Sequence, residues 1–259
     1  MDLKPKLHQL SVEMMDILHA IKADPVMAVH SIRKSTKFLR AIINLLPEPD
    51  NDMRKSWKGI SRSLAPYRDA HVLHELYQSL VAMSDLYPNT ELSKRLVNDP
   101  YLLQAYPAQD ELDELFKIVE KILRKIEGGD FEIDDSALNT KINKNFQKAR
   151  VQFSLLLNDD GMPAVHALRK KVKRLWYQLR VKFGDPEESL PGTPLARTDA
   201  LGQHLGYIHD LDSLNLRAQG EACSELIPQI RALRKSAFNQ AIGESAILFS
   251  DDWIDLRAY

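Results

Sequence analysis

The sequence predicts an all-α protein made of two related halves. Three observations lead to this fold class. The 259 residues include only ten glycines; apolar residues recur three and four positions apart over long stretches, which is typical of helices that bury one face; and two blocks of residues occur twice in the same order. The alternating β-branched runs that mark strands are missing. We therefore expect an internally duplicated helical fold.

The apolar spacing predicts eight helices, separated mostly by prolines. A proline lacks the backbone N–H and fixes φ, so it is tolerated best between helices. Pro66 is the exception, because it lies inside a helical pattern and is expected to break or kink the helix just before Tyr67. The expected helices are 6–22, 26–46, 52–84, 110–127, 136–158, 163–183, 195–220 and 223–249.

The duplication is visible in the residues themselves. Residues 28–39 (AVHSIRKSTKFL) recur as residues 164–175 (AVHALRKKVKRL), and residues 64–73 (LAPYRDAHVL) are answered by residues 205–214 (LGYIHDLDSL). Two matching blocks in the same order indicate a repeated unit. The Gly128-Gly129 pair at the middle of the chain is the expected linker. The halves are then 1–129 and 130–259, each a bundle of about four helices.

Composition restricts the class of protein and of partner. Hydrophobic residues make up 44% of the chain and charged residues 27%, so the chain is globular and buries a substantial core. The formal net charge is −1, and an anionic partner therefore requires local segregation of charge. Cys223 is the single cysteine, which excludes an intramolecular disulfide. No secretory leader or apolar run of membrane-spanning length is visible, so a cytoplasmic protein is expected.

Two helices carry polar faces that are entirely cationic. Between residues 25 and 47, and again between 161 and 184, there is no acidic residue. At about 100° per residue, the basic side chains of each helix fall within a sector of roughly 120°. Like charges three and four apart repel by a few tenths of a kcal/mol per pair, so their repetition favours an anionic partner over a merely solvated face. The sets are His30, Arg33, Lys34, Lys37 and Arg40, and His166, Arg169, Lys170, Lys173 and Arg180, with Tyr177 on the second face.

Further cations flank these two faces. Arginine grips phosphate oxygens with its planar fork and lysine supplies a flexible point charge, and this mixture suits a repeating phosphate chain such as inorganic polyphosphate. The histidines add donors whose charge depends on pH. The additional residues expected to contribute are Lys58, Arg62, Lys148 and Arg174.

The second repeated block leaves a metal-dependent alternative open. A His-Asp pair such as His209-Asp210 is what metal-dependent phosphohydrolases of the HD type use. The first copy has Arg68 where the second has His209, and arginine does not ligate metals. We therefore expect Asp69 and Asp210 to accept hydrogen bonds from basic side chains and hold the basic faces in place. A metal site at His204, His209 and Asp212 is the minor alternative.

No sequence signature of catalysis is present. The phosphate-binding loop, the dinucleotide fingerprint, the zinc-protease helix motif and the nucleophile elbow are all missing. We expect a binding protein with no catalytic residues, no metal and no cofactor. Nucleic acid is the alternative ligand. It is disfavoured because Trp176 and Tyr177 are the only aromatic residues interleaved with the basic faces, and a membrane partner is not expected.

The duplicated A-V-H-x-[IL]-R-K-x-x-K motif, together with the block that follows each copy, resembles the CHAD family of conserved histidine α-helical domains. The resemblance covers nearly the whole chain. It implies two pseudo-symmetric four-helix bundles packed into one compact unit, with a basic central groove that binds inorganic polyphosphate. The implied binding residues are His30, Arg33, Lys34 and Lys37, and His166, Arg169, Lys170 and Lys173. An enzyme of polyphosphate metabolism would act in trans, and association with polyphosphate granules is expected.

Two features depart from strict repetition. Arg40 is answered by Trp176 and Phe38 by Arg174, so the two basic faces are not equivalent. The segment 86–109, rich in proline and tyrosine, is longer than the corresponding connection in the second half. It is expected to be either a lid or an insertion without functional consequence.

Overall fold

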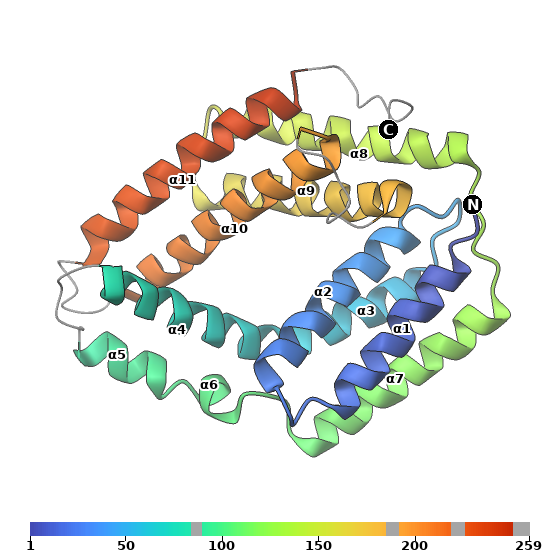
Figure 1. The fold of residues 1–259 in the computed structure, drawn as a ribbon, viewed down its shortest axis with the longest axis horizontal. Coiled ribbons are helices and arrows are strands. Elements are labelled where there is room, and N and C mark those ends of the chain that lie inside the picture. Colours follow the sequence, from blue (N-terminus) through green and yellow to red (C-terminus); the bar gives the residue numbers. More distant parts are fainter. Residues whose placement is uncertain (84–89, 185–191, 219–225, 251–259) are drawn as a thin grey trace. The chain divides into compact units, whose positions relative to one another are not determined.

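The computed structural model describes residues 1–83, 90–184, 192–218 and 226–250, and its regular elements there are all helices (Figure 1). The predicted all-α class is thus confirmed. None of these helices is both long and apolar enough to span a membrane. The eleven helices of the described residues are α1 Lys4–His19, α2 Pro25–Ile43, α3 Asn51–Ser63, α4 Ala65–Met83, α5 Thr90–Val97, α6 Pro100–Gln104, α7 Gln109–Gly128, α8 Asp135–Leu156, α9 Met162–Phe183, α10 Pro194–Ala218 and α11 Leu226–Leu248.

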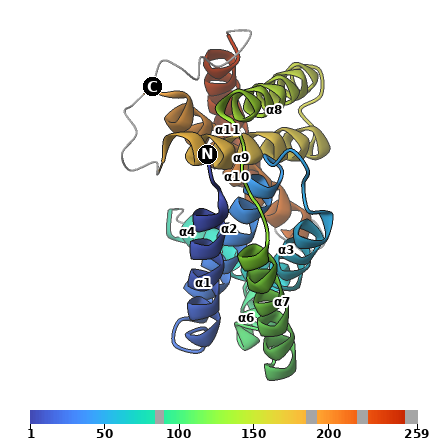
Figure 2. The ribbon, with the colours of Figure 1, turned by 90° about the vertical axis from the view of Figure 1, so that its right-hand side faces the viewer.

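The first compact unit is a helical bundle formed by Met1–Val72 and Val97–Leu138. Its helices α1, α2, α3 and α7 run alongside one another (Figure 2). Fully buried side chains from all four helices fill the interior, where each removes apolar surface from water. The core includes Leu7, Met14, Ile32, Leu39, Trp57 and Val119.

The second unit comprises Leu73–Leu96 and Asn139–Tyr259. The later turns of α4 and the helix α5 pack there against α10 and α11, in a cluster that joins Leu73, Tyr77, Leu92, Leu211 and Ile230. The described residues of α4 after Val72 and of α5 therefore pack with helices from the second half of the sequence. The predicted halves 1–129 and 130–259, their origin by duplication and the central groove stay predictions.

The helix expected over 52–84 is divided into α3 and α4. The break falls at Leu64, and Pro66 is the second residue of α4, where a helix has no use for the missing N–H. The segment 86–109, expected as a connection, contains α5 and α6. Its residues 86–89 lie outside the described part of the chain, as do the predicted helix end at 219–220 and helix start at 223–225.

The predicted linker is tied to the start of the chain. The amide of Leu3 donates to the carbonyl of Phe131 at 3.0 Å, and the amide of Ile133 donates to the carbonyl of Met1 at 3.0 Å. A Cβ added at Gly129 would approach the Phe131 ring to 2.6 Å, so only glycine fits there without a shift. Gly128-Gly129 thus begins a fixed backbone connection within unit 1.

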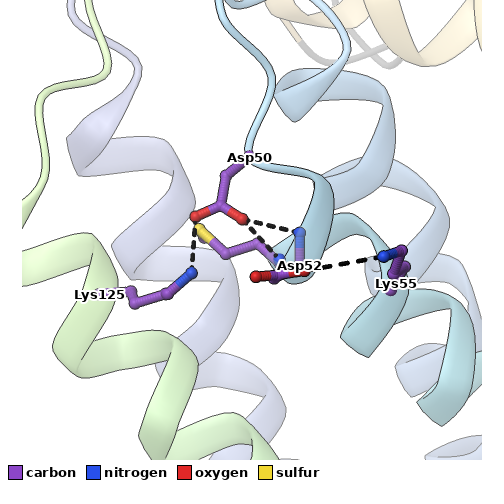
Figure 3. Close-up of polar contacts among 5 residues, drawn as sticks. Asp50, Asp52, Lys55 and Lys125 are labelled. Carbon is purple, nitrogen blue, oxygen red and sulfur yellow. Dashed lines mark hydrogen bonds and ion pairs between the residues drawn. The ribbon is translucent and has the colours of Figure 1, made fainter.

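The start of α3 is fixed by a carboxylate that serves two helices (Figure 3). Asp50 accepts from the amides of Asp52 and Met53, both at 2.9 Å, and from Lys125 Nζ of α7, also at 2.9 Å. Burial acts to raise the pKa of Asp50, but the hydrogen bonds from Lys125 and the two amides outweigh it and hold the pKa below its ordinary value. This cap orients α3, which carries Lys58 and Arg62.

Candidate functional site

The first basic face, the α2 stripe (His30, Arg33, Lys34, Lys37, Arg40), follows from how α2 folds. Asp24 caps the helix by accepting from the amide of Met27 at 3.1 Å, and Pro25 occupies its first turn. Val29, Ile32 and Leu39 are fully buried. Burial of this apolar side leaves His30 and Lys34 exposed, whereas Arg33, Lys37 and Arg40 are partly buried.

Arg33 of the α2 stripe contacts two other helices. Its Nη1 donates to the carbonyl of Ser61 in α3 at 2.9 Å, and its Nη2 lies 3.7 Å from Asp69 Oδ1 in α4. The Arg33 side chain is 15% exposed and that of Asp69 is 66% exposed. One arginine thus joins three helices of unit 1 at the stripe. Lys58 and Arg62 of α3 are exposed.

The second basic face, the α9 stripe (His166, Arg169, Lys170, Lys173), lies in unit 2 on a helix with the same design. Gly161 precedes the helix and Pro163 lies in its first turn. Val165, Leu168, Val172 and Leu175 form the buried side. Lys170 is exposed, while His166, Arg169 and Lys173 are partly buried.

His166 faces a second histidine from α10. The ring centroids of His166 and His209 lie 5.0 Å apart at an interplanar angle of 38°. Burial, followed by the charges of Lys170 and Arg169, lowers the pKa of His166. Its buried Nδ1 has no hydrogen-bond partner in the described structure, and the same holds for the buried Nε of Arg169. Both nitrogens are closed off from solvent, so the stripe offers an anion its accessible groups, among them the exposed ammonium of Lys170.

Two glycines of α10 face the α9 stripe, and Gly202 is the one at which a side chain would crowd it. A Cβ at Gly202 would lie 3.1 Å from both Cε and Nζ of Lys173, and a Cβ at Gly206 would lie 3.8 Å from Arg169 Nε. A glycine inside a helix costs about 1 kcal/mol relative to alanine. Sequence reasoning missed this feature, although the signal was present as two glycines spaced four apart within one expected helix.

Lys173 is also positioned by an acid and an aromatic ring. Its Nζ lies 3.9 Å from Asp199 Oδ1 in α10 and 5.0 Å from the centroid of the Trp176 ring, over which the Arg180 guanidinium also lies at 5.1 Å. Trp176 is 6% exposed. The ring face attracts both cations, which holds Lys173 at the α10 side of α9.

The remaining predicted residues differ in accessibility. Tyr177 is only 5% exposed, which argues against its predicted contact with a phosphate chain. Lys148 on α8 is exposed, and Arg174 and Asp210 are partly buried. Burial, followed by the charges of Arg174 and Lys148, lowers the pKa of Lys171, which was not among the predicted site residues. Its position outside the original sector on the helical wheel explains the omission.

The structure gives other contacts to two of the residues of the metal-dependent alternative. Within the described residues, no three His, Cys, Asp or Glu side chains lie together as metal ligands would. Asp212 accepts from Arg234 Nε at 2.6 Å, and the His209 ring packs at a tilt against His166. Asp212 and His209 therefore take part in an ion pair and a ring contact.

The model of the CHAD domain matches residues 15–219. The chain belongs to the CHAD family. This family is associated with polyphosphate binding and is generally non-catalytic, and both stripes of the present CHAD domain lie within the matched residues.

A solved structure also resembles this CHAD protein. PptA from Streptomyces chartreusis superposes with a TM-score of 0.58 at 15% sequence identity, and the match covers 97% of each chain. At this identity the likeness concerns the fold alone. No curated protein matches the chain significantly.

The pKa of His166 leads to a prediction about pH. The pKa of His166 is lower in the folded CHAD domain than in the unfolded chain, where it is about 6.5. The contribution of His166 to the free energy of unfolding is therefore fully present above about pH 6.5 and is lost as the pH falls toward the pKa of the folded state. A bound polyanion favours the protonated ring, so the midpoint of His166 should rise when tripolyphosphate is added.

NMR titration of the imidazole nitrogens measures this midpoint with and without ligand. Protonation of His166 should also make tripolyphosphate bind more tightly at acidic pH. The His166→Gln variant should lose part of this gain in affinity, whereas His8→Gln, which alters an exposed histidine in unit 1, should retain it. An identical His166 midpoint in free and ligand-saturated protein would rule out contact between this ring and the anion.

Proposed function

We propose that this CHAD domain binds inorganic polyphosphate without catalysis, through the α2 stripe and the α9 stripe. The observation that carries the proposal is the α9 stripe. It is an acid-free cationic face in which Lys170 is exposed and Arg169 and Lys173 are partly exposed. A ligand with closely spaced anionic oxygens would form charge-assisted contacts with these groups and offset the repulsion along the helix.

The stripes favour a linear phosphate chain over a folded anionic ligand. Each presents an exposed lysine, Lys34 or Lys170, beside a partly buried arginine, which is Arg33 in unit 1 and Arg169 in unit 2. The planar arginine forks give geometric selectivity for phosphate oxygens, and the flexible lysines follow a chain without a fixed register. Asp69 and Asp210 are proposed to orient the basic side chains rather than to react.

The wider setting of the function is also proposed. The two stripes are taken as copies of one motif, in accordance with the predicted duplication and its basic groove. A partner enzyme of polyphosphate metabolism would act in trans on the bound chain. The protein is proposed to be cytoplasmic and to associate with polyphosphate granules.

Titration with long-chain polyphosphate at several salt concentrations tests this function. Single-stranded polyanions lose about 0.7 logarithmic units of affinity per tenfold increase in salt for each phosphate neutralised. Four such contacts predict a loss of about 50-fold between roughly 50 and 200 mM salt. Affinity that is micromolar or tighter at low salt, with such a slope, is expected.

The same titration distinguishes nucleic acid as the ligand. Proteins that bind single strands stack bases on accessible aromatic rings, but Trp176 and Tyr177 are both buried. Single-stranded DNA should therefore compete poorly against polyphosphate of equal total charge. Equal or better competition by DNA would contradict the proposed ligand, and the lack of any binding at low salt would contradict the function as a whole.

A further inference from the structure

The hairpin of α8 and α9 in unit 2 carries a second group of cations, here named the α8–α9 cluster (Lys141, Lys144, Lys148, Lys171, Arg174). Asn145 Nδ2 of α8 donates to Gln178 Oε1 of α9 at 2.8 Å, and the two helices run side by side in both views (Figures 1 and 2). This hydrogen bond fixes which sides of α8 and α9 meet.

Helical geometry places the cluster beside that hydrogen bond. Gln178 follows Lys171 by two turns, so at about 100° per residue the two lie within about 20° of each other around α9. On α8, Asn145 lies one turn from both Lys141 and Lys148. Lys171 is in turn about 160° from Lys173, whose ammonium lies against Gly202 of α10. The cluster is therefore on the α8 side of α9.

The cations of the α8–α9 cluster lie close enough to repel one another. Burial, followed by Arg174 and Lys148, lowers the pKa of Lys171, and burial with Lys144 lowers that of Lys141. Asp135 is the only acid on α8, and α9 has none. Like charges gathered across two helices repel one another, and a bound anion would lower that repulsion.

The cluster is continuous with the α9 stripe. Around the axis of α9, Lys170 lies about 60° from Lys173, Arg174 lies about 40° beyond Lys170, and Lys171 lies about 60° beyond Arg174. Lys170 is exposed and Arg174 is partly exposed. Cations thus succeed one another from the α10 side of the helix to its α8 side without an intervening acid.

We propose that the α8–α9 cluster is a second contact segment for polyphosphate, occupied only by chains long enough to extend around α9 from the α9 stripe. This inference rests on the proposed function and adds a dependence on ligand length. A short oligomer such as tripolyphosphate is held by the stripe alone. A long chain gains further ion contacts on α8, and each adds affinity that salt weakens.

The test uses residues of the cluster that lie outside the set assigned to the stripes. The variant K141Q/K144Q/K171Q removes three cations from α8 and α9, and its matched control, K55Q/K117Q/K121Q, removes three exposed lysines from α3 and α7. The variant is expected to bind tripolyphosphate as the unmodified protein does and to bind long-chain polyphosphate about tenfold more weakly, with a shallower salt slope. The control should match the unmodified protein with both ligands.

The outcomes separate this inference from the proposed function. If the unmodified protein binds neither polyphosphate, the proposed function fails. If it binds both but the variant retains full long-chain affinity, or loses short-chain and long-chain affinity equally, the second segment is wrong. If the variant loses affinity for single-stranded DNA but keeps its affinity for long-chain polyphosphate, the cluster binds DNA rather than polyphosphate and the second segment is also wrong. Because Lys141 and Lys171 are partly buried, Lys144→Glu at an exposed position repeats the test without risk to folding.

Discussion

The combined replacement of Lys34, Lys37, Lys170 and Lys173 by glutamine is expected to weaken long-chain polyphosphate binding by about 100-fold to 1000-fold. Charge-assisted hydrogen bonds contribute about 1.5–3 kcal/mol each where they are partly shielded, and exposed ion pairs contribute at most about 1 kcal/mol. Lys37 and Lys173 are partly buried, whereas Lys34 and Lys170 are exposed. Arg33 is retained because its contact with Ser61 supports the packing of α2 on α3.

A control with the same change in net charge isolates the effect of position. The variant K22Q/K55Q/K117Q/K121Q removes four exposed lysines outside both stripes, and its affinity should fall by less than about threefold through long-range electrostatics alone. Isothermal titration calorimetry at two salt concentrations measures both variants. Equal losses in the two would mean that net charge, rather than the stripes, determines binding. The pairs K34Q/K37Q and K170Q/K173Q then show whether each stripe takes part.

Asp212→Ala is expected to lower the free energy of unfolding by about 2–3 kcal/mol. The Arg234 guanidinium of α11 donates to Asp212 Oδ1 of α10 at 2.6 Å and to the carbonyl of Asp160, beyond the end of α8, at 2.8 Å. Removing one partner of a buried pair typically costs about 3–5 kcal/mol. The lower figure applies here because the side chain of Arg234 remains 21% exposed.

Urea denaturation of single and double variants measures this coupling. The double variant D212A/R234M should be more stable than the sum of the two single changes predicts, because it leaves no unpaired charge. Lys235→Met, at the exposed neighbouring position, should change stability by less than about 0.5 kcal/mol. Strict additivity of the two single changes would show that the 2.6 Å contact contributes nothing specific.

Features of the fold that depend on neighbouring residues in the sequence could be predicted, whereas those that depend on tertiary packing could not. Helices with strong apolar spacing, such as α2 and α9, were predicted within a few residues of their bounds, since one buried face is visible in the sequence. The assignment of residues 73–96 to unit 2 was not predictable. The cluster that joins Leu80 and Leu92 to Leu214 depends on tertiary packing, about which apolar spacing contains no information.

The candidate site shows the same division. A helical wheel identified the stripes, but it could not reveal that Arg33 is the basic residue beside Asp69 or that His166 packs against His209, because these contacts join different helices. The wheel also placed Tyr177 on the basic face, where the packed structure buries it. Lys171 was left out because a single sector on one helix ignores the cations of the neighbouring helix α8.

Replacing Gly202 with alanine is expected to raise thermal stability and to lower ligand affinity. Alanine there would gain up to about 1 kcal/mol of helix propensity, but its Cβ would lie 3.1 Å from the end of the Lys173 side chain and displace the ammonium group. Gly243 of α11 has no atom within 4 Å of such a Cβ, so the same change there has no such conflict. Directed evolution for heat resistance alone would therefore accept both alanines, and only the one at position 202 would compromise the binding face.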